Sequence, residues 1–158
     1  MSTVDTHGGA KDPMEVSSNA TMQEATASGK PDLPLRLSRA LIVEPHPAVA
    51  ASLARQCHTL GWVARIVERT EAVAAALAEF RPHAVVTSIV IPDPEAFAVL
   101  AAIATHDHDL PVLCLLDHRP GATGSLSALR ADLLPRRMER AAKPLRHRSL
   151  AEFLQTAA

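Results

Sequence analysis

Apolar residues along this chain fall into two kinds of segment. Short apolar runs, bounded by proline, glycine or charged residues, lie at 39–44, 62–67, 84–92 and 110–116. Such runs are typical of strands that are buried on both faces of a parallel sheet. Between them, apolar residues recur at helical spacing in the segments 49–60, 73–80 and 97–104. Strands that alternate with helices through short loops predict right-handed βαβ units and a parallel sheet with helices on both faces.

The alternation is less regular beyond Asp117. Ser125 can cap a helix that runs to about Leu134, where Pro135 would end it. Segment 141–144, Ala-Ala-Lys-Pro, predicts a short last strand that runs into a turn. A closing helix follows, and its apolar face is formed by Leu150, Phe153 and Leu154.

The first part of the chain has a different composition. Residues 1–36 are rich in Ser, Thr, Gly, Asp and Met and have no apolar period that could bury a face. We expect a disordered tail there, either an inert extension or a partner-binding arm, followed by one domain over residues 37–158.

Bulk properties narrow the class of protein. The formal net charge is only -1, so the molecule has no overall bias toward nucleic acid or membrane. No apolar run approaches the roughly 18 residues that a membrane span requires, and the first residues do not resemble a signal peptide. Cys57 and Cys114 have no partner motif nearby. We therefore expect a soluble cytoplasmic protein with two unpaired thiols.

Four strings together resemble the receiver domain of bacterial two-component response regulators. In chain order they are Leu41-Ile-Val-Glu44 with Pro47, then Pro82 to Pro92, then Leu110 to Leu116, and finally the pair Lys143-Pro144. The similarity covers roughly residues 38–158. It implies an α/β fold of the flavodoxin or CheY type, a doubly wound (βα)5 unit whose five parallel strands have the order 2-1-3-4-5.

The residues that carry the family's chemistry are changed. Ser88 stands where the resemblance places the phosphorylated aspartate, and Pro45 replaces the second member of the acidic pair that begins with Glu44. Leu116 takes the place of a hydroxyl residue, and besides Glu44 only Lys143 is retained. A serine cannot form the acyl phosphate, and one carboxylate is a poor magnesium site. We therefore expect a degenerate pocket, a pseudo-receiver with no catalytic residue, metal or cofactor.

Two residues of this pocket allow more than one interpretation. Lys143 either pairs with Glu44 across the strand ends or binds an anion above the sheet; the ion pair is the favoured interpretation. Ser88 either satisfies a backbone group or is phosphorylated by a Ser/Thr kinase, and the backbone bond is favoured. Elsewhere in the chain, the run His106-Asp-His-Asp109 alternates metal-ligand types, but no second cluster lies nearby in sequence, and a solvated loop is expected.

A basic segment, 130–148, is dominated by arginine rather than lysine and contains Arg130, Arg136, Arg137, Arg140, Arg146 and Arg148. Arg140 also falls near the position of the family's aromatic switch. Guanidinium groups form bidentate pairs with phosphate. The segment is therefore a candidate face for a protein partner (a kinase, a regulator or a second copy) or for cyclic di-GMP, or it is only a solvated basic surface. Duplex DNA binding is not expected, because no helix-turn-helix pattern follows.

Overall fold

The computed structural model describes residues 36–89, 93–117 and 130–158. The chain divides into two units, Met1–Arg36 and Leu37–Ala158, and all the helices and strands below belong to the second. The cap predicted at Ser125 lies outside the described residues.

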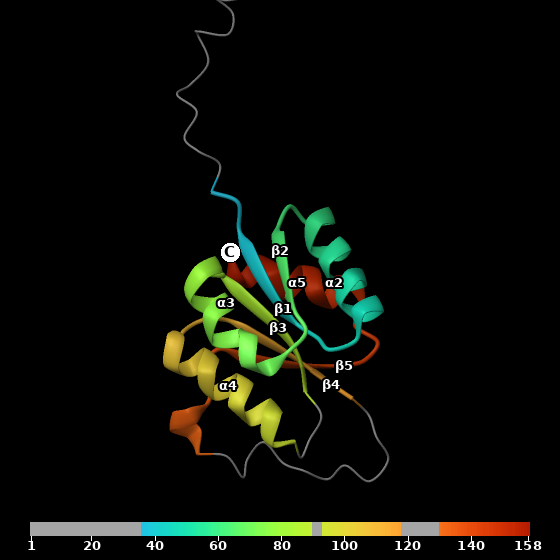
Figure 1. Ribbon diagram of the computed structural model, residues 1–158. Coiled ribbons are helices and arrows are strands. Elements are labelled where there is room, and N and C mark those ends of the chain that lie inside the picture. Colours follow the sequence, from blue (N-terminus) through green and yellow to red (C-terminus); the bar gives the residue numbers. More distant parts are fainter. Residues whose placement is uncertain (1–35, 90–92, 118–129) are drawn as a thin grey trace, which may run out of the picture. The chain divides into compact units, whose positions relative to one another are not determined.

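The second unit is built on a five-stranded sheet (Figure 1). Its strands are β1 (Arg39–Val43), β2 (Val63–Val67), β3 (Ala84–Ile89), β4 (Val112–Leu116) and β5 (Met138–Ala142). They pair in the order β2-β1-β3-β4-β5, and every pair is parallel. This order confirms the fold class predicted from the sequence, a doubly wound flavodoxin-like sheet.

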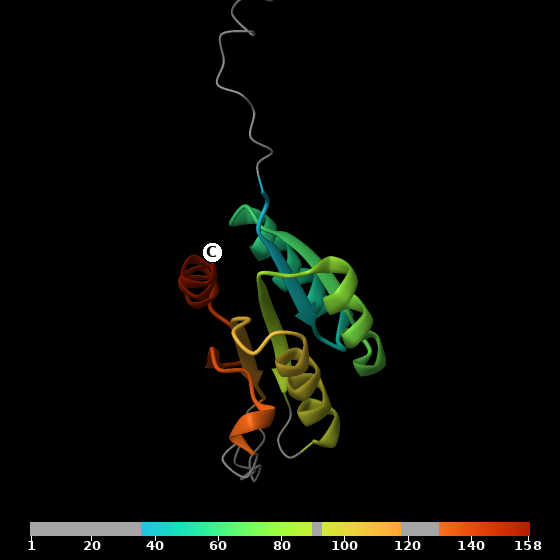
Figure 2. The same cartoon turned by 90° about the vertical axis from the view of Figure 1, so that its left-hand side faces the viewer.

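Helices cover both faces of the sheet. They are α2 (Pro47–Thr59), α3 (Val73–Phe80), α4 (Pro94–His106) and α5 (His147–Ala157), with short 3-10 helices at Thr70–Ala72 (η1) and Ala131–Leu133 (η3). One apolar core joins α3 and α4 to one face, and a second joins α2 and α5 to the other. Figure 2 shows these two layers on opposite sides of the strands. In the central strands, side chains on both faces of the sheet contact one of the two cores, so these strands are buried on both faces.

Local sequence explains where the helices begin and end. Pro47 occupies the first turn of α2, where its missing N–H is not needed, and the turn after this helix contains Gly61 at a φ of 81°. A φ of this sign is readily adopted by glycine because it has no Cβ. At α4, the Asp93 carboxylate caps the first turn by accepting the Glu95 N–H at 2.9 Å.

Two elements of the last part differ from the sequence-based expectation. The last strand begins at Met138 rather than at Ala141, so Glu139 and Arg140 lie within it. Both side chains are exposed because β5 is the last strand of the sheet, and an exposed strand need not be apolar. In the described part of the segment that was predicted to be a helix up to Leu134, the backbone forms a 3-10 turn, η3, instead of an α-helix.

The two cysteines are unpaired, as predicted, and both are buried. Burial raises the pKa of the Cys57 thiol to about 11 and that of the Cys114 thiol to about 12. Both therefore remain neutral thiols at neutral pH and behave as small apolar core residues. Among the described residues, no helix has the length and apolar character needed to cross a membrane.

The C-cap of α3 offers a stability test. Arg81 has a φ of 48°, and its carbonyl oxygen accepts hydrogen bonds from the Arg39 guanidinium at 2.8 and 3.0 Å. Left-handed backbone is strained for a residue with a Cβ, whereas glycine adopts it freely. Replacing Arg81 with glycine should therefore raise the free energy of unfolding by about 0.5–1 kcal/mol, as measured by urea denaturation.

The matched control is Arg69→Gly, at an exposed position with an extended φ of -120°. This change should not raise the free energy of unfolding, because the native backbone is unstrained at this position and glycine only increases the conformational entropy of the unfolded state. An equal gain in the two variants would contradict the strain at Arg81.

Candidate functional site

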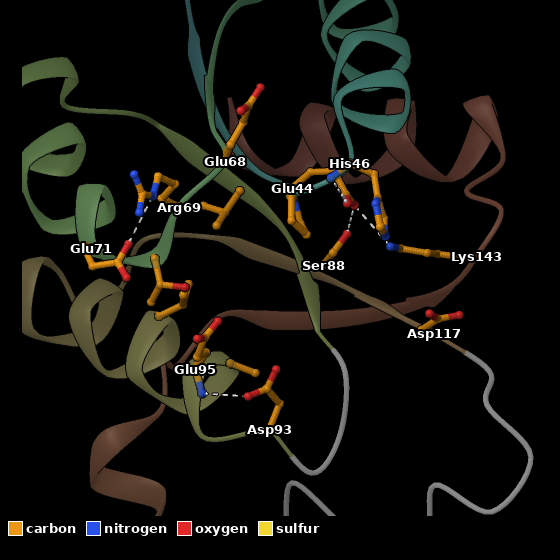
Figure 3. Close-up of a pocket in the computed structure, with 15 residues that line it drawn as sticks. Glu44, His46, Glu68, Arg69, Glu71, Ser88, Asp93, Glu95, Asp117 and Lys143 are labelled. Atoms are coloured by element: carbon orange, nitrogen blue, oxygen red, sulfur yellow. Dashed lines mark hydrogen bonds and ion pairs between the residues drawn. The ribbon is translucent and has the colours of Figure 1, made fainter.

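Three side chains meet at the carboxyl edge of the sheet, the edge where the strands end. Glu44 follows β1, Ser88 lies near the end of β3, and Lys143 follows β5. Figure 3 shows Ser88 and Lys143 turned toward the Glu44 carboxylate from their separate strands. These three residues are called the Glu44 cluster below.

Both oxygens of the Glu44 carboxylate have hydrogen-bond donors beside them. Oε2 accepts a hydrogen bond from Ser88 Oγ and lies 3.1 Å from Lys143 Nζ, while Oε1 accepts the backbone N–H of His46 at 3.0 Å. Glu44 is 0% exposed, and the Lys143 side chain is 22% exposed. A charged group is tolerated away from water when it is paired and hydrogen-bonded, and the donors on both oxygens of the buried Glu44 carboxylate meet this condition.

The ionisation of Glu44 follows from this balance. Burial alone raises the pKa of its carboxyl group, but the hydrogen bonds from Ser88, His46 and Lys143 and the charge of Lys143 outweigh it. The net result is a pKa below the ordinary value of 4.5. Glu44 is therefore a carboxylate at neutral pH, and the cluster is an ion pair rather than a shared proton.

The structure decides both interpretations of these side chains' contacts. The predicted pair between Lys143 and Glu44 is confirmed. The expected backbone bond of Ser88 is wrong, because its hydroxyl donates to the Glu44 carboxylate instead. A carboxylate that has kept its charge inside the protein accepts strongly, so it competes successfully with a neutral carbonyl for the hydroxyl proton.

A cavity of about 300 Å³ opens beside the cluster. Five further carboxylates line it, and sequence reasoning did not single them out: Glu68, Glu71, Asp93, Glu95 and Asp117. Glu68 and Asp117 could have been found from their positions directly after β2 and β4. Pro45 lines the cavity, whereas Leu116 packs against the core with α3 and α4. Among the described residues, no group of His, Cys, Asp or Glu is arranged to hold a metal ion.

The arginines of the basic segment are distributed over opposite ends of β5 and α5. Arg136 and Arg137 precede β5: Arg136 Nη1 lies 3.5 Å from Asp109 Oδ1, and Arg137 Nη2 donates to the Thr156 carbonyl oxygen at 3.0 Å. Thr156 belongs to the last turn of α5, so this pair of arginines lies at the amino edge of the sheet.

The remaining arginines lie elsewhere. Arg146 and Arg148 are at the start of α5, on the carboxyl-edge side, and Arg148 Nε bonds to Glu152 Oε1 at 2.9 Å. Arg140 is exposed in the middle of β5, and Arg130 pairs with Asp132 at 2.9 Å. Proximity in sequence therefore does not bring these six side chains into one surface patch.

Solved receiver domains have the same fold. A response regulator receiver domain from Clostridium thermocellum matches with a TM-score of 0.62 at 14% identity, over 77% of this chain and 94% of that one. A CheY-like receiver domain from Methylobacillus flagellatus has a TM-score of 0.60 at 21% identity, over 77% and 99% of the two chains. At such identities the likeness establishes the fold alone.

A third neighbour of the same fold contains a metal ion. It is the receiver domain of a sensor histidine kinase from Pseudomonas aeruginosa, which has a magnesium ion coordinated in its active-site cleft. It matches with a TM-score of 0.57 at 17% identity, over 76% of this chain and 96% of that one. No protein-family model matches the sequence of the present chain, and no curated protein matches it.

Proposed function

We propose that this domain is a pseudo-receiver, a module of bacterial signal transduction that docks on a protein partner without being phosphorylated. The single observation that carries the proposal is the closed Glu44 cluster. Its only carboxylate already accepts from Ser88 and the His46 N–H and is paired with Lys143, so both of its oxygens are engaged within the protein. The nucleophile that phosphoryl transfer needs is replaced by a hydroxyl group that is already engaged.

The proposal places the function on the surface rather than in the pocket. Receiver domains are regulatory modules that bind kinases and other regulators, and a fold of this kind without its switch retains the surfaces for such contacts. The proposed partner is a kinase, a regulator or a second copy of the chain, and the compartment is the cytoplasm. Neither an enzymatic activity nor a cofactor is part of the proposal.

The positions of the arginines do not favour the cyclic di-GMP alternative. Arg136 and Arg137 are bound to groups at the amino edge, whereas Arg146 and Arg148 start α5 at the other end. An α-helix rises about 1.5 Å per residue, so the two pairs are roughly 15 Å apart along α5. A compact dinucleotide clamp would need guanidinium groups that converge on its phosphates.

The proposal predicts the response to a phosphodonor. Purified protein that is incubated with acetyl phosphate and Mg²⁺ should gain no phosphoryl mass by intact mass spectrometry, and beryllofluoride with Mg²⁺ should leave its amide NMR spectrum unchanged. The physical reason is the absence of a carboxylate nucleophile at Ser88. A receiver domain with an intact acidic pocket serves as the positive control in the same tubes. Stoichiometric labelling of Ser88 would contradict the proposal.

A further inference from the structure

The outer edge of β5 presents backbone groups that no other strand of the described residues uses. The Val112 N–H donates to the Arg137 carbonyl at 2.8 Å, and the Lys143 N–H donates to the Leu116 carbonyl at 3.2 Å. Odd-numbered residues of this strand therefore turn their N–H and C=O toward β4. Because the direction alternates along a strand, the backbone groups of Met138, Arg140 and Ala142 point away from the sheet.

A groove runs beside this edge. It has a volume of about 630 Å³ and lies between β5 and α5. Residues of β5 form one wall, including the small side chains of Ala141 and Ala142, and the other is formed by Ser149 and Glu152 of α5 with its N-cap residue Arg146. Small residues at the edge leave room for a further strand, so main-chain hydrogen bonds can form without rearrangement of β5.

The charge of the groove selects its occupant. Lys143 is already paired with Glu44, and Glu152 is paired with Arg148. The other charged residues of the lining are Arg140, Arg146 and Glu139, which leaves an excess of positive charge at the end near α5's first turn. An extended segment that carries carboxylates complements this arrangement, and a basic one does not.

A second copy of β5 is a poor occupant. Two β5 strands related by a twofold axis would have to pair antiparallel. The register that uses all three outward-facing residues, Met138, Arg140 and Ala142, places Arg140 directly opposite its symmetry mate. Like charges directly opposite each other destabilise a strand pair. The edge therefore suits a different protein better than its own copy.

We propose that the edge of β5 and the adjoining groove bind an extended, acidic segment of a partner protein, which adds to the sheet as a sixth strand. This proposal rests on the docking function proposed above and specifies the chemistry of the partner and its mode of binding. Main-chain bonds to Met138, Arg140 and Ala142 supply the pairing, and the contacts of its carboxylates with Arg140 and Arg146 supply the selectivity.

The test uses two short capped peptides, one alternating glutamate with valine and one alternating lysine with valine. Each is titrated to millimolar concentration into the isotope-labelled full chain at neutral pH, and amide shifts and hydrogen exchange are recorded. The glutamate peptide should slow exchange at Arg140 and Ala142 at least about tenfold. Amides of Glu139 and Ala141 already face β4 and should change less.

The other edge of the sheet provides an internal control. In β2 the Val63 N–H bonds to the Ser38 carbonyl, and the Val67 carbonyl accepts the Glu44 N–H. Ala64 and Ile66 are therefore the outward-facing residues of that edge. Their amides should not be protected by the glutamate peptide. Equal protection at both edges would mean unselective strand pairing and would overturn the proposal.

The exposed Arg140 allows a matched charge reversal. Arg140→Glu should weaken binding of the glutamate peptide at least about tenfold while the melting temperature stays within about 2 °C of the parent. A glutamate peptide that is N-methylated at alternate amides should also lose binding, because it cannot complete the ladder. No protection at Arg140 and Ala142, or equal protection by the lysine peptide, would overturn the proposal.

The outcomes of this test and of the phosphodonor test are separable. Phosphoryl labelling would remove the pseudo-receiver proposal even if the β5 edge bound the glutamate peptide. If the protein is not phosphorylated and its β5 edge does not bind the peptide, the pseudo-receiver proposal stands. Only the proposal of an acidic partner strand is then overturned.

Discussion

Replacing Lys143 with methionine should lower the free energy of unfolding by about 3 kcal/mol at neutral pH, because the change leaves a buried carboxylate without its cation. Glu44 is 0% exposed, and Lys143 Nζ lies 3.1 Å from its Oε2. Methionine matches the apolar part of the lysine side chain, so the change reports the charge rather than the packing. Chemical denaturation at a single ionic strength gives the difference.

The loss of stability caused by Lys143→Met should depend on pH. In the parent protein the pKa of Glu44 is below its ordinary value, so the stability it contributes is complete above the unfolded-state pKa and is lost as the pH falls through the folded-state pKa. Without Lys143, fewer interactions oppose the effect of burial, so the folded-state pKa of Glu44 rises. The variant can then relieve the cost by binding a proton, so the difference between the two proteins should shrink in acid.

Two controls make this result specific. Arg148→Met removes an exposed pair with Glu152 and should cost no more than about 0.5 kcal/mol. Adding Glu44→Gln to the Lys143→Met variant should recover part of the loss, since no buried charge then remains. A Lys143→Met variant as stable as its parent at neutral pH would contradict the role given to the ion pair.

Replacing Ser88 with aspartate should convert the cluster from a stable ion pair into a strained acidic pocket. The new carboxylate would lie against Glu44, and two adjacent carboxylates resist joint ionisation. The expected cost is about 1–3 kcal/mol at neutral pH without metal, equivalent to a pKa shift of about one or two units. Millimolar Mg²⁺ should then raise the melting temperature of the variant by several degrees, because two carboxylates and water suit this ion.

The parent protein and Ser88→Asn are the matched comparisons. Asparagine has the shape of aspartate and can still donate to Glu44, so neither protein should respond to Mg²⁺. An aspartate variant that is as stable as its parent and indifferent to Mg²⁺ would mean that Ser88 and Glu44 are not in contact in solution.

The sequence was a good guide to the centre of the fold and a poor one to its edge. Strands such as β3 and β4 are buried on both faces, so their mainly apolar sequences identify them directly. The exposed strand β5 contains Glu139 and Arg140 and has no apolar pattern to read. Its true extent is decided by pairing with β4, a long-range interaction that periodicity does not contain.

The candidate site divides in the same way. The pair between Glu44 and Lys143 could be predicted because parallel strands end at one edge, which brings residues 99 apart in the chain together. The hydroxyl of Ser88 could not be assigned a partner, because that choice depends on side-chain positions a few ångströms apart. The separation of Arg136 from Arg146 could not be predicted either. Strand β5 lies between them in the chain and runs from the amino edge of the sheet to its carboxyl edge.

The salt link between Glu44 and Lys143 also bears on the speed and regulation of binding. Lys143 contributes to the wall of the groove beside β5, and its ammonium group is held by a carboxylate at the far end of β1. A loop anchored in this way is preorganised, so a partner pays little conformational entropy to bind it. If the domain is the pseudo-receiver proposed above, no minor active population has to be selected before binding, and binding carries no population penalty. The output of the proposed module would then be set by the amounts of the two proteins that the cell makes and not by a phosphorylation step.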